Sequence, residues 1–264
     1  MKAVTSKLIT SKADGVGHII LNQPEKRNAI AYEMWQGIAV TADDYASDDT
    51  VRVVVISGAG DKAFSAGADI SQFAEKRSDK AATDDYNATV RKALDAVDRI
   101  GKPTIAMVQG FCVGGGMSLA THFDMRIASD DSRFGIPAAK LGLAYRWEDV
   151  HALVQLIGPT FTREILYTGR LFDATEAQQM GLVNRVMPQS ELQAFVSDYA
   201  ARIAANAPLT VRSVKETVNQ ALKDPAARDI AQVERLIEAC FASEDYQEGR
   251  KAFMEKRKPE FQGR

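Results

Sequence analysis

Three consecutive glycines at positions 114–116 constrain the fold more than any other feature of this sequence. They follow an apolar run at 104–108 that is typical of a buried strand, and they precede an apolar, helix-like stretch. Glycines at such a junction cost backbone entropy, and they let another group approach the main chain closely. The first N–H groups of a helix are unpaired and lie at the positive end of its dipole. The junction therefore suits a developing anion, although a tight turn without function has the same pattern.

A second stretch, residues 63–70 (A-F-S-A-G-A-D-I), has the same character. It follows the apolar run at 51–57, and its acid precedes a predicted helix that begins at Ile70. Two loops that each present a bare backbone N–H can together hold one carbonyl oxygen as it becomes an oxyanion. Ser118 does not lie in the Gly-x-Ser-x-Gly pattern of a hydrolase nucleophile, which disfavours a serine hydrolase.

Composition narrows the possible partners. The chain has 264 residues and a formal net charge of −2, which argues against nucleic acid as the main partner. No run is long enough to span a bilayer and the first residues lack a signal-peptide core, so we expect a cytoplasmic protein without membrane contact. The two cysteines and the three histidines are not spaced like the ligands of a metal site or the cysteines of a redox pair, so no metal site is expected. These residues are Cys112, Cys240, His18, His122 and His151.

Strand and helix patterns alternate over the first 187 residues, which indicates an α/β architecture. Strands are expected at 16–22, 51–57, 104–108, 125–128 and 183–186, with helices at 29–46 and 82–99. Asn28 is expected to cap the first helix. From Ser190 the pattern is helical only. Ser190 and Gln193 fit a capping box, Pro208 starts a second helix, a third covers 230–241, and a fourth runs from Ser243 to Pro259.

Four motifs together resemble the enoyl-CoA hydratase/isomerase, or crotonase, superfamily: residues 21–30, 63–70, 111–120 and 243–259. The resemblance runs from about residue 8 to the C-terminus, in the order and spacing of that family. It implies a ββα spiral core followed by a C-terminal helical oligomerisation region. The change in sequence character near residues 190–200 sets the boundary, with the core over 1–195 and the helical region over 196–264. It also implies an acyl-CoA thioester enzyme that forms a homotrimer or a dimer of trimers. No separate cofactor is implied, because coenzyme A enters as part of the substrate.

The resemblance also implies site residues. It assigns the two oxyanion donors to the backbone N–H groups of Ala66 and Gly115. Contacts with the substrate and its coenzyme A are implied for Lys26, Arg27, Ala66, Gly67, Ala68, Asp69, Ile70, Gly114, Gly115, Phe253 and Lys256. Arg146 is a further candidate for substrate binding, because its charge could pair with a substrate carboxylate. Of these, Phe253 and Lys256 match tail positions that can reach the coenzyme A of a neighbouring subunit. For Lys26 and Arg27, a solvated charged turn is an equally good interpretation.

The two glutamates with which the resembled hydratases activate water and protonate Cα are absent. Their positions fall at Ser118 and Ala138, and neither side chain can act as a general base. Decarboxylation or another enolate reaction is therefore favoured over efficient hydration. Tyr145 matches a functional tyrosine of the methylmalonyl-CoA decarboxylase branch, but the histidine of that branch corresponds to Ala68.

Several alternatives stay open at this stage. Arg146 could pair with a substrate carboxylate or face solvent, and Tyr145 could act on the enolate or pack on the core. Glu148 and Asp149 could be displaced acid–base residues, although acids in the first turn of a helix also stabilise its dipole. A non-catalytic acyl-CoA scaffold is the competing function from another class.

Overall fold

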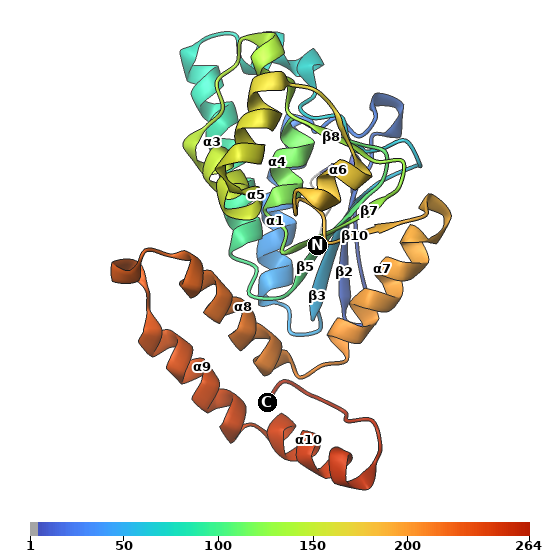
Figure 1. The fold of residues 1–264 in the computed structure, drawn as a ribbon, viewed down its shortest axis with the longest axis vertical. Coiled ribbons are helices and arrows are strands. Elements are labelled where there is room, and N and C mark those ends of the chain that lie inside the picture. The colour runs from blue at the N-terminus through green and yellow to red at the C-terminus, as the bar shows by residue number, and fades with distance from the viewer. Residues whose placement is uncertain (1–4) are drawn as a thin grey trace.

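Two β-sheets form the centre of the computed structural model, which describes residues 5–264 (Figure 1). The larger sheet has the strand order β1-β2-β3-β5-β7-β10, and all neighbours are parallel except β1 and β2. Its strands are β1 (Leu8–Ala13), β2 (Val16–Leu21), β3 (Val53–Gly58), β5 (Thr104–Val108), β7 (Met125–Ser129) and β10 (Arg185–Met187). The smaller sheet has the order β4 (Ala63–Ser65), β6 (Phe111–Val113), β8 (Arg133–Gly135) and β9 (Phe172–Asp173).

Successive strands alternate between the two sheets. The pairs β3/β4, β5/β6 and β7/β8 each place one strand in the larger sheet and the next in the smaller one, and each pair leads into a helix. The helices of this part are α1 (Tyr32–Ser47), α2 (Phe73–Lys76), α3 (Lys80–Asp98), α4 (Gly115–Thr121), α5 (Trp147–Thr168) and α6 (Ala174–Gln179). This repetition is the ββα spiral of the predicted α/β fold class, which is confirmed.

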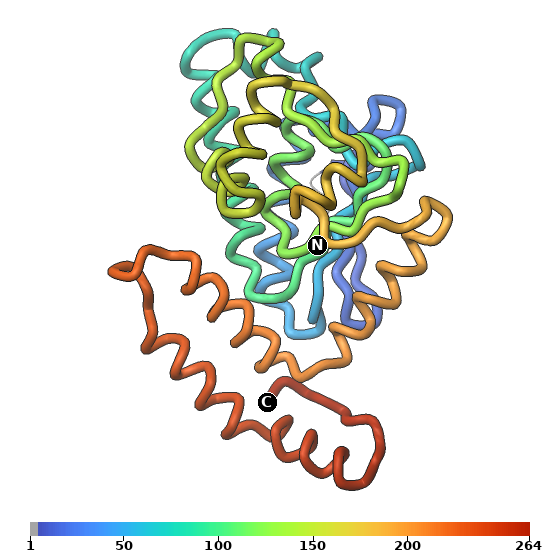
Figure 2. Tube along the Cα trace, viewed as in Figure 1, coloured from blue at the N-terminus to red at the C-terminus, as the bar shows by residue number. Residues whose placement is uncertain are grey.

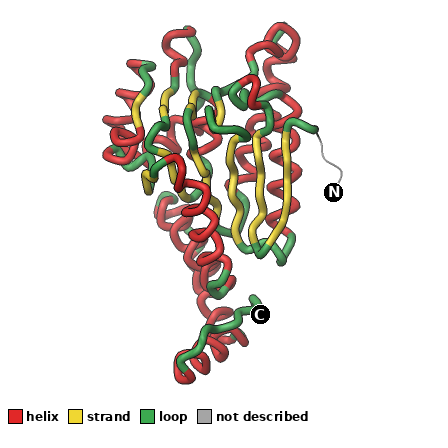
Figure 3. Tube along the Cα trace, turned by 90° about the vertical axis from the view of Figure 1, so that its right-hand side faces the viewer, coloured by secondary structure: helices red, strands yellow, loops and turns green. Residues whose placement is uncertain are grey.

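The larger sheet is covered on both faces, and the alternation along β3 shows it. Val54 and Ile56 belong to the main core with α1, α3 and the smaller sheet, whereas Val53 and Val55 face a second cluster. Helix α7 (Gln189–Ala204) supplies that cluster with its buried side, Leu192, Val196, Ala200 and Ala204. Figure 3 shows strands of this sheet with helices beside them.

Helix α7 corrects the predicted domain boundary. Because it packs on the sheet as far as Ala204, a boundary at residue 195 would fall inside a core helix. The appended region begins after Ala204 and contains α8 (Pro208–Leu222), α9 (Ile230–Ala242) and α10 (Glu244–Glu255), which extend away from the core (Figures 1 and 2). It is tied to the core by polar contacts such as the Lys215–Asp124 ion pair at 2.9 Å.

Two predicted helix caps are wrong. Helix α1 begins at Tyr32 after Ala31, while Asn28 is buried with a φ of 54° and its amide donates to the carbonyl oxygens of Ala59 and Ala63. The Asn28 side chain therefore links its own loop to the segment 59–63 and does not cap a helix. Helix α7 begins at Gln189 after Pro188, so Ser190 already lies inside the helix. Within residues 5–264, no helix is both long and apolar enough to cross a membrane.

Candidate active site

The glycine-rich junction lies where sequence reasoning expected it, between β6 and α4. Gly114 has a φ of 54°, a conformation that favours glycine, and a Cβ on Gly116 would lie 2.6 Å from the Cβ of Ser65. The glycines thus let α4 begin against the end of β4. The first helical bond runs from the Ser118 N–H to the Gly114 carbonyl oxygen at 2.9 Å, which leaves the Gly115 N–H unpaired within the described chain.

The second loop corrects the assignment of the other donor. The N–H of Ala66 donates to the carbonyl oxygen of Arg27 at 2.9 Å, so it is not free to bind a substrate oxygen. The prediction that Ala66 is an oxyanion donor is therefore wrong in this structure. Two residues on, the N–H of Ala68 has no acceptor in the part of the chain that the structure describes.

A short parallel bridge turns the Ala68 N–H toward the glycine-rich junction. The Ile30 N–H donates to the Gly67 carbonyl oxygen at 2.7 Å, and the Asp69 N–H donates to the Ile30 carbonyl oxygen at 3.0 Å. The N–H between these two bonds must point to the other side of the strand. On that side, the Ala68 nitrogen lies 3.5 Å from the position of a Cβ on Gly115. The two unpaired N–H groups are thus neighbours.

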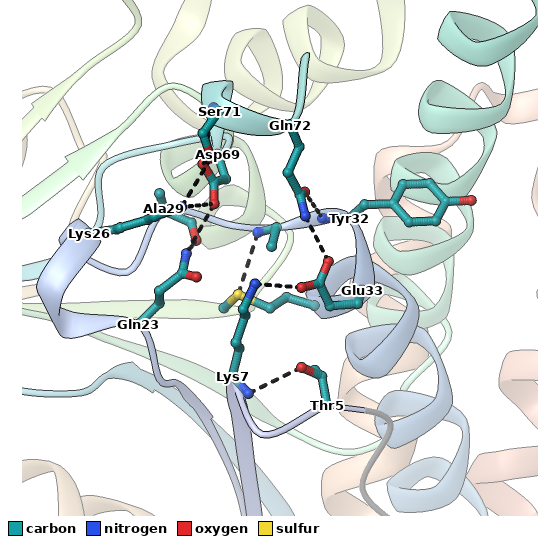
Figure 4. A network of polar contacts seen from close by, with 12 residues as sticks. Thr5, Lys7, Gln23, Lys26, Ala29, Tyr32, Glu33, Asp69, Ser71 and Gln72 are labelled. Atoms are coloured by element: carbon teal, nitrogen blue, oxygen red, sulfur yellow. Dashed lines mark hydrogen bonds and ion pairs between the residues drawn. The ribbon is translucent and has the colours of Figure 1, made fainter. Parts of the chain in front are cut away.

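A polar network holds this second loop in place (Figure 4). The buried Asp69 carboxylate accepts hydrogen bonds from the Ser71 N–H at 3.1 Å and from the Lys26 ammonium at 2.9 Å, and Gln23 also reaches it. Burial alone would raise the pKa of Asp69, but the hydrogen bonds from Ser71 and Lys26 outweigh it and lower this pKa. Lys26 and Asp69 were both predicted to contact coenzyme A, and in this structure their charged groups face each other.

The neighbouring positions of the coenzyme A prediction lie at the surface. The Arg27 guanidinium lies over the Phe111 ring, 5.0 Å from its centroid, and Ile70 is 72% exposed. Phe253, on α10, is 83% exposed. Lys256 directly follows that helix, which belongs to the C-terminal helices that extend away from the core containing α4 (Figure 1). Phe253 and Lys256 are therefore remote from the glycine-rich junction of their own chain.

Helix α4 also positions Ser118, and its partner comes from α5. The buried Ser118 hydroxyl donates to the Asp149 carboxylate. Glu148 instead pairs with the Arg91 guanidinium at the surface, where both side chains are largely exposed. Ala138 is buried in the turn Pro137–Leu141 and brings no polar side chain. Glu148 and Asp149 were both candidates for a displaced acid. In the structure, Asp149 contacts Ser118, the residue at the first glutamate position, and Glu148 does not.

Tyr145 and Arg146 lie just before α5 with different surroundings. Tyr145 packs against the main core, and its hydroxyl has no hydrogen-bond partner among residues 5–264. Burial, together with the charges of Asp149 and Cys112, raises the pKa of Tyr145. Arg146 and Asp149 line a cavity of about 830 Å³ between α3, α5 and α8, and neither Ala68 nor Gly115 belongs to its wall.

Sequence reasoning missed two side chains that hold the far end of α4. Arg126 is 3% exposed and donates to the carbonyl oxygens of Phe123 (2.5 Å), Leu182 (2.6 Å) and Ala120 (3.2 Å), while burial lowers its pKa to about 10. His122 Nδ1 lies 2.8 Å from Asp98. Leu182 and Asp98 are distant in sequence from the side chains that they bind, so no local motif signals these contacts. Within the described residues, no group of three potential ligands could hold a metal ion.

Comparisons with known proteins identify the family of this chain. The family model described as enoyl-CoA hydratase/isomerase matches residues 11–264. A probable enoyl-CoA hydratase of Mycobacterium bovis is 35% identical over 96% of this chain and 97% of its own. A crotonyl-CoA hydratase of Syntrophomonas wolfei is also 35% identical, with the same coverage. A solved enoyl-CoA hydratase/carnithine racemase from Magnetospirillum magneticum superimposes with a TM-score of 0.94 at 35% identity, covering 98% of this chain and 97% of that one. The chain therefore belongs to the enoyl-CoA hydratase/isomerase, or crotonase, family of acyl-CoA enzymes.

Proposed function

We propose that this protein stabilises the enolate of an acyl-CoA thioester between the N–H groups of Ala68 and Gly115. The observation that carries the proposal is that these two N–H groups are unpaired and adjacent. A thioester oxygen that gains negative charge would accept from both, and one such donor typically contributes about 3–4 kcal/mol to the barrier reduction. Coenzyme A belongs to the substrate, and no further cofactor is proposed.

The reaction that we favour is decarboxylation or another enolate reaction, in place of efficient hydration. Ser118 and Ala138 stand where the family's hydratases carry two glutamates, and adding water requires both activation of water and protonation of Cα. Loss of CO2 from a malonyl-type thioester needs no base, because the electron pair of the broken C–C bond becomes the enolate. Arg146 would pair with the substrate carboxylate and Tyr145 would orient it or protonate the enolate.

Hydration with a displaced acid is the second candidate. The names of the relatives support it, since several are called hydratases. The acid would be Asp149, because its carboxylate accepts from Ser118, whereas Glu148 is paired with Arg91. A non-catalytic scaffold would also keep the fold, and activity measurements separate it from both.

Product analysis tests the proposed reaction. The purified protein is incubated separately with crotonyl-CoA and methylmalonyl-CoA, and the thioesters are identified by mass spectrometry. Conversion of methylmalonyl-CoA without rapid formation of 3-hydroxybutyryl-CoA supports enolate chemistry of the proposed kind. Rapid hydration of crotonyl-CoA would contradict the first candidate and favour the second. Binding of both thioesters without any conversion across a wider acyl-CoA panel would indicate a scaffold.

We also propose that the chain assembles as a homotrimer or a dimer of trimers. Apolar side chains on α8, α9 and α10 are exposed in the single chain: Val214, Val218, Leu222, Ile230, Ile237, Phe241, Phe253 and Met254. A groove of about 610 Å³ between these helices is lined in part by Val214, Ile237 and Phe241. Exposed apolar surface of this extent is typical of an interface. In such an assembly, Phe253 and Lys256 would reach the coenzyme A of a neighbour.

A further inference from the structure

We propose that Asp149, held by Ser118, is the acid–base residue that moves protons at the substrate Cα. Ser118 and Asp149 together would replace the glutamate that the family's hydratases carry at position 118. Helix α4 supplies the Ser118 hydroxyl, and helix α5 supplies the Asp149 carboxylate. This inference rests on the proposed enolate site, and it names the residue that would give a proton to the enolate carbon or take one from it.

The register of α4 places the Asp149 carboxylate near the proposed oxyanion position. Ser118 follows Gly115 by three residues, so the two lie on the same side of the helix, about 4.5 Å apart along its axis. The Ser118 hydroxyl points to the Asp149 carboxylate and donates to it. We infer that a thioester whose oxygen lies at the Gly115 N–H directs its adjacent Cα toward the Ser118 side of α4, where this carboxylate is held.

The Asp149 carboxylate is not neutralised by a cation, unlike that of its neighbour Glu148 among residues 5–264. Within the described part of the chain it forms no ion pair, whereas the adjacent Glu148 is neutralised by Arg91. The negative charge of Asp149 acts on the partly buried Tyr145 and on His122, and it helps to raise the pKa of each. Asp149 also lines the 830 Å³ cavity, through which its proton can exchange with water.

The proposed step is a reversible proton transfer. The Asp149 carboxylate takes a proton from Cα, and the electron pair of the C–H bond forms the C=C bond of the enolate. The carbonyl π pair moves onto the oxygen, where the Ala68 and Gly115 N–H groups hold it. The protonated Asp149 returns this proton, or one exchanged with water, to the carbon skeleton.

Hydrogen–deuterium exchange at Cα tests the step without requiring the natural substrate. Butyryl-CoA is incubated with enzyme in D2O and its Cα deuterium content is followed by mass spectrometry, while calorimetry gives its Kd. The wild type should catalyse exchange, and Asp149→Asn should slow it by about 100- to 10,000-fold with the Kd nearly unchanged. The matched control Glu148→Gln should exchange as the wild type does.

A rescue variant separates catalysis from structure. Adding Ser118→Glu to the Asp149→Asn variant puts a carboxylate back at this position from the α4 side, and it should restore exchange at least tenfold over Asp149→Asn. Three outcomes would overturn the inference: exchange retained in Asp149→Asn, binding of butyryl-CoA by the wild type without exchange, or no rescue. A wild type that binds no acyl-CoA would instead overturn the proposed function itself.

Discussion

The amide nitrogen of Ala68 lies 3.5 Å from the position that a Cβ atom on Gly115 would occupy. A side chain at residue 115 would therefore stand in front of one of the two unpaired N–H groups. Because glycine at this position has an ordinary negative φ, its role is to leave space and not to allow an unusual backbone. The space between the two loops is the feature on which the proposed chemistry depends.

Gly115→Ala should remove activity while leaving the fold intact. The added Cβ meets Ala68 and Trp35 at 3.5 and 3.6 Å, which are ordinary contacts, so the free energy of unfolding should change little. The methyl group would displace the substrate oxygen, and kcat should fall by about 100- to 1,000-fold. Steady-state kinetics together with thermal unfolding measure the two effects.

Gly116→Ala is the matched control for that variant. Its Cβ would lie 2.6 Å from the Ser65 Cβ and 2.8 Å from the Ser65 carbonyl oxygen, so the backbone must shift. We expect this variant to lose about 1–3 kcal/mol of stability. A Gly115→Ala variant that unfolds as readily as Gly116→Ala would show that residue 115 matters for packing.

Lys26→Met should destabilise the second loop. It leaves the buried Asp69 carboxylate without its ammonium partner, and because Lys26 is itself 45% exposed the cost should be on the order of 1 kcal/mol at neutral pH. Urea unfolding measures it against Lys62→Met, an exposed lysine with no ion pair among the described residues. If Lys26→Met instead lost affinity for coenzyme A without losing stability, Lys26 would be assigned to the predicted contact with coenzyme A.

The effect of Lys26→Met should also depend on pH. Hydrogen bonds lower the pKa of Asp69 in the folded protein, so the stabilisation is present above its unfolded pKa of about 3.9. It disappears as the pH falls through the lowered folded value, where Asp69 becomes protonated. The difference between wild type and variant should therefore shrink below about pH 4. A difference that stays constant into this acid range would contradict the pairing.

Tyr145→Phe should lower turnover with little effect on stability. The hydroxyl has no partner among residues 5–264, so its removal should change the free energy of unfolding by less than about 0.5 kcal/mol. Its raised pKa keeps the hydroxyl protonated at neutral pH, able to donate to a substrate. Tyr167→Phe, on the exposed side of α5, is the control. Equal turnover of the wild type and Tyr145→Phe would assign Tyr145 to packing.

Phe241→Asp should prevent assembly without unfolding the chain. Phe241 is 64% exposed in the single chain and lines the apolar groove of the C-terminal helices. A charged side chain at this position is tolerated in a solvated monomer, but burying it in an interface without a partner costs free energy. Light scattering after size exclusion should give the mass of a trimer or hexamer for the wild type and of smaller species for the variant. Ala239→Asp, at an exposed neighbouring position, should assemble normally. A monomeric wild type would refute the proposed assembly.

The start of α4 could be predicted from sequence because its signal is local. Three glycines between a strand-like and a helix-like apolar run indicate a close-packed junction where a helix begins, and α4 does begin at Gly115. The choice between Ala66 and Ala68 could not be made in this way. It depends on the carbonyl oxygen of Arg27, which lies far away in sequence and occupies the N–H of Ala66.

Side chains that bridge distant segments limited the prediction in the same way. Asn28 has the chemistry of a helix cap, but the carbonyl oxygens of Ala59 and Ala63 compete for its amide. Glu148 and Asp149 both fit the first turn of a helix, and only the packing of α5 against α4 decides which of them meets Ser118. The helical pattern that follows Ser190 predicts α7, but a helical period does not show that this helix covers the main sheet.

A crystal structure with butyryl-CoA tests the central claim most directly. We expect the thioester oxygen to lie about 2.7–3.1 Å from the backbone nitrogens of both Ala68 and Gly115. The Ala66 N–H should stay bonded to Arg27, as it is in the free protein. A thioester oxygen that contacts neither Ala68 nor Gly115, or that displaces the Arg27 carbonyl oxygen from the Ala66 N–H, would contradict the proposal that Ala68 and Gly115 form the oxyanion site.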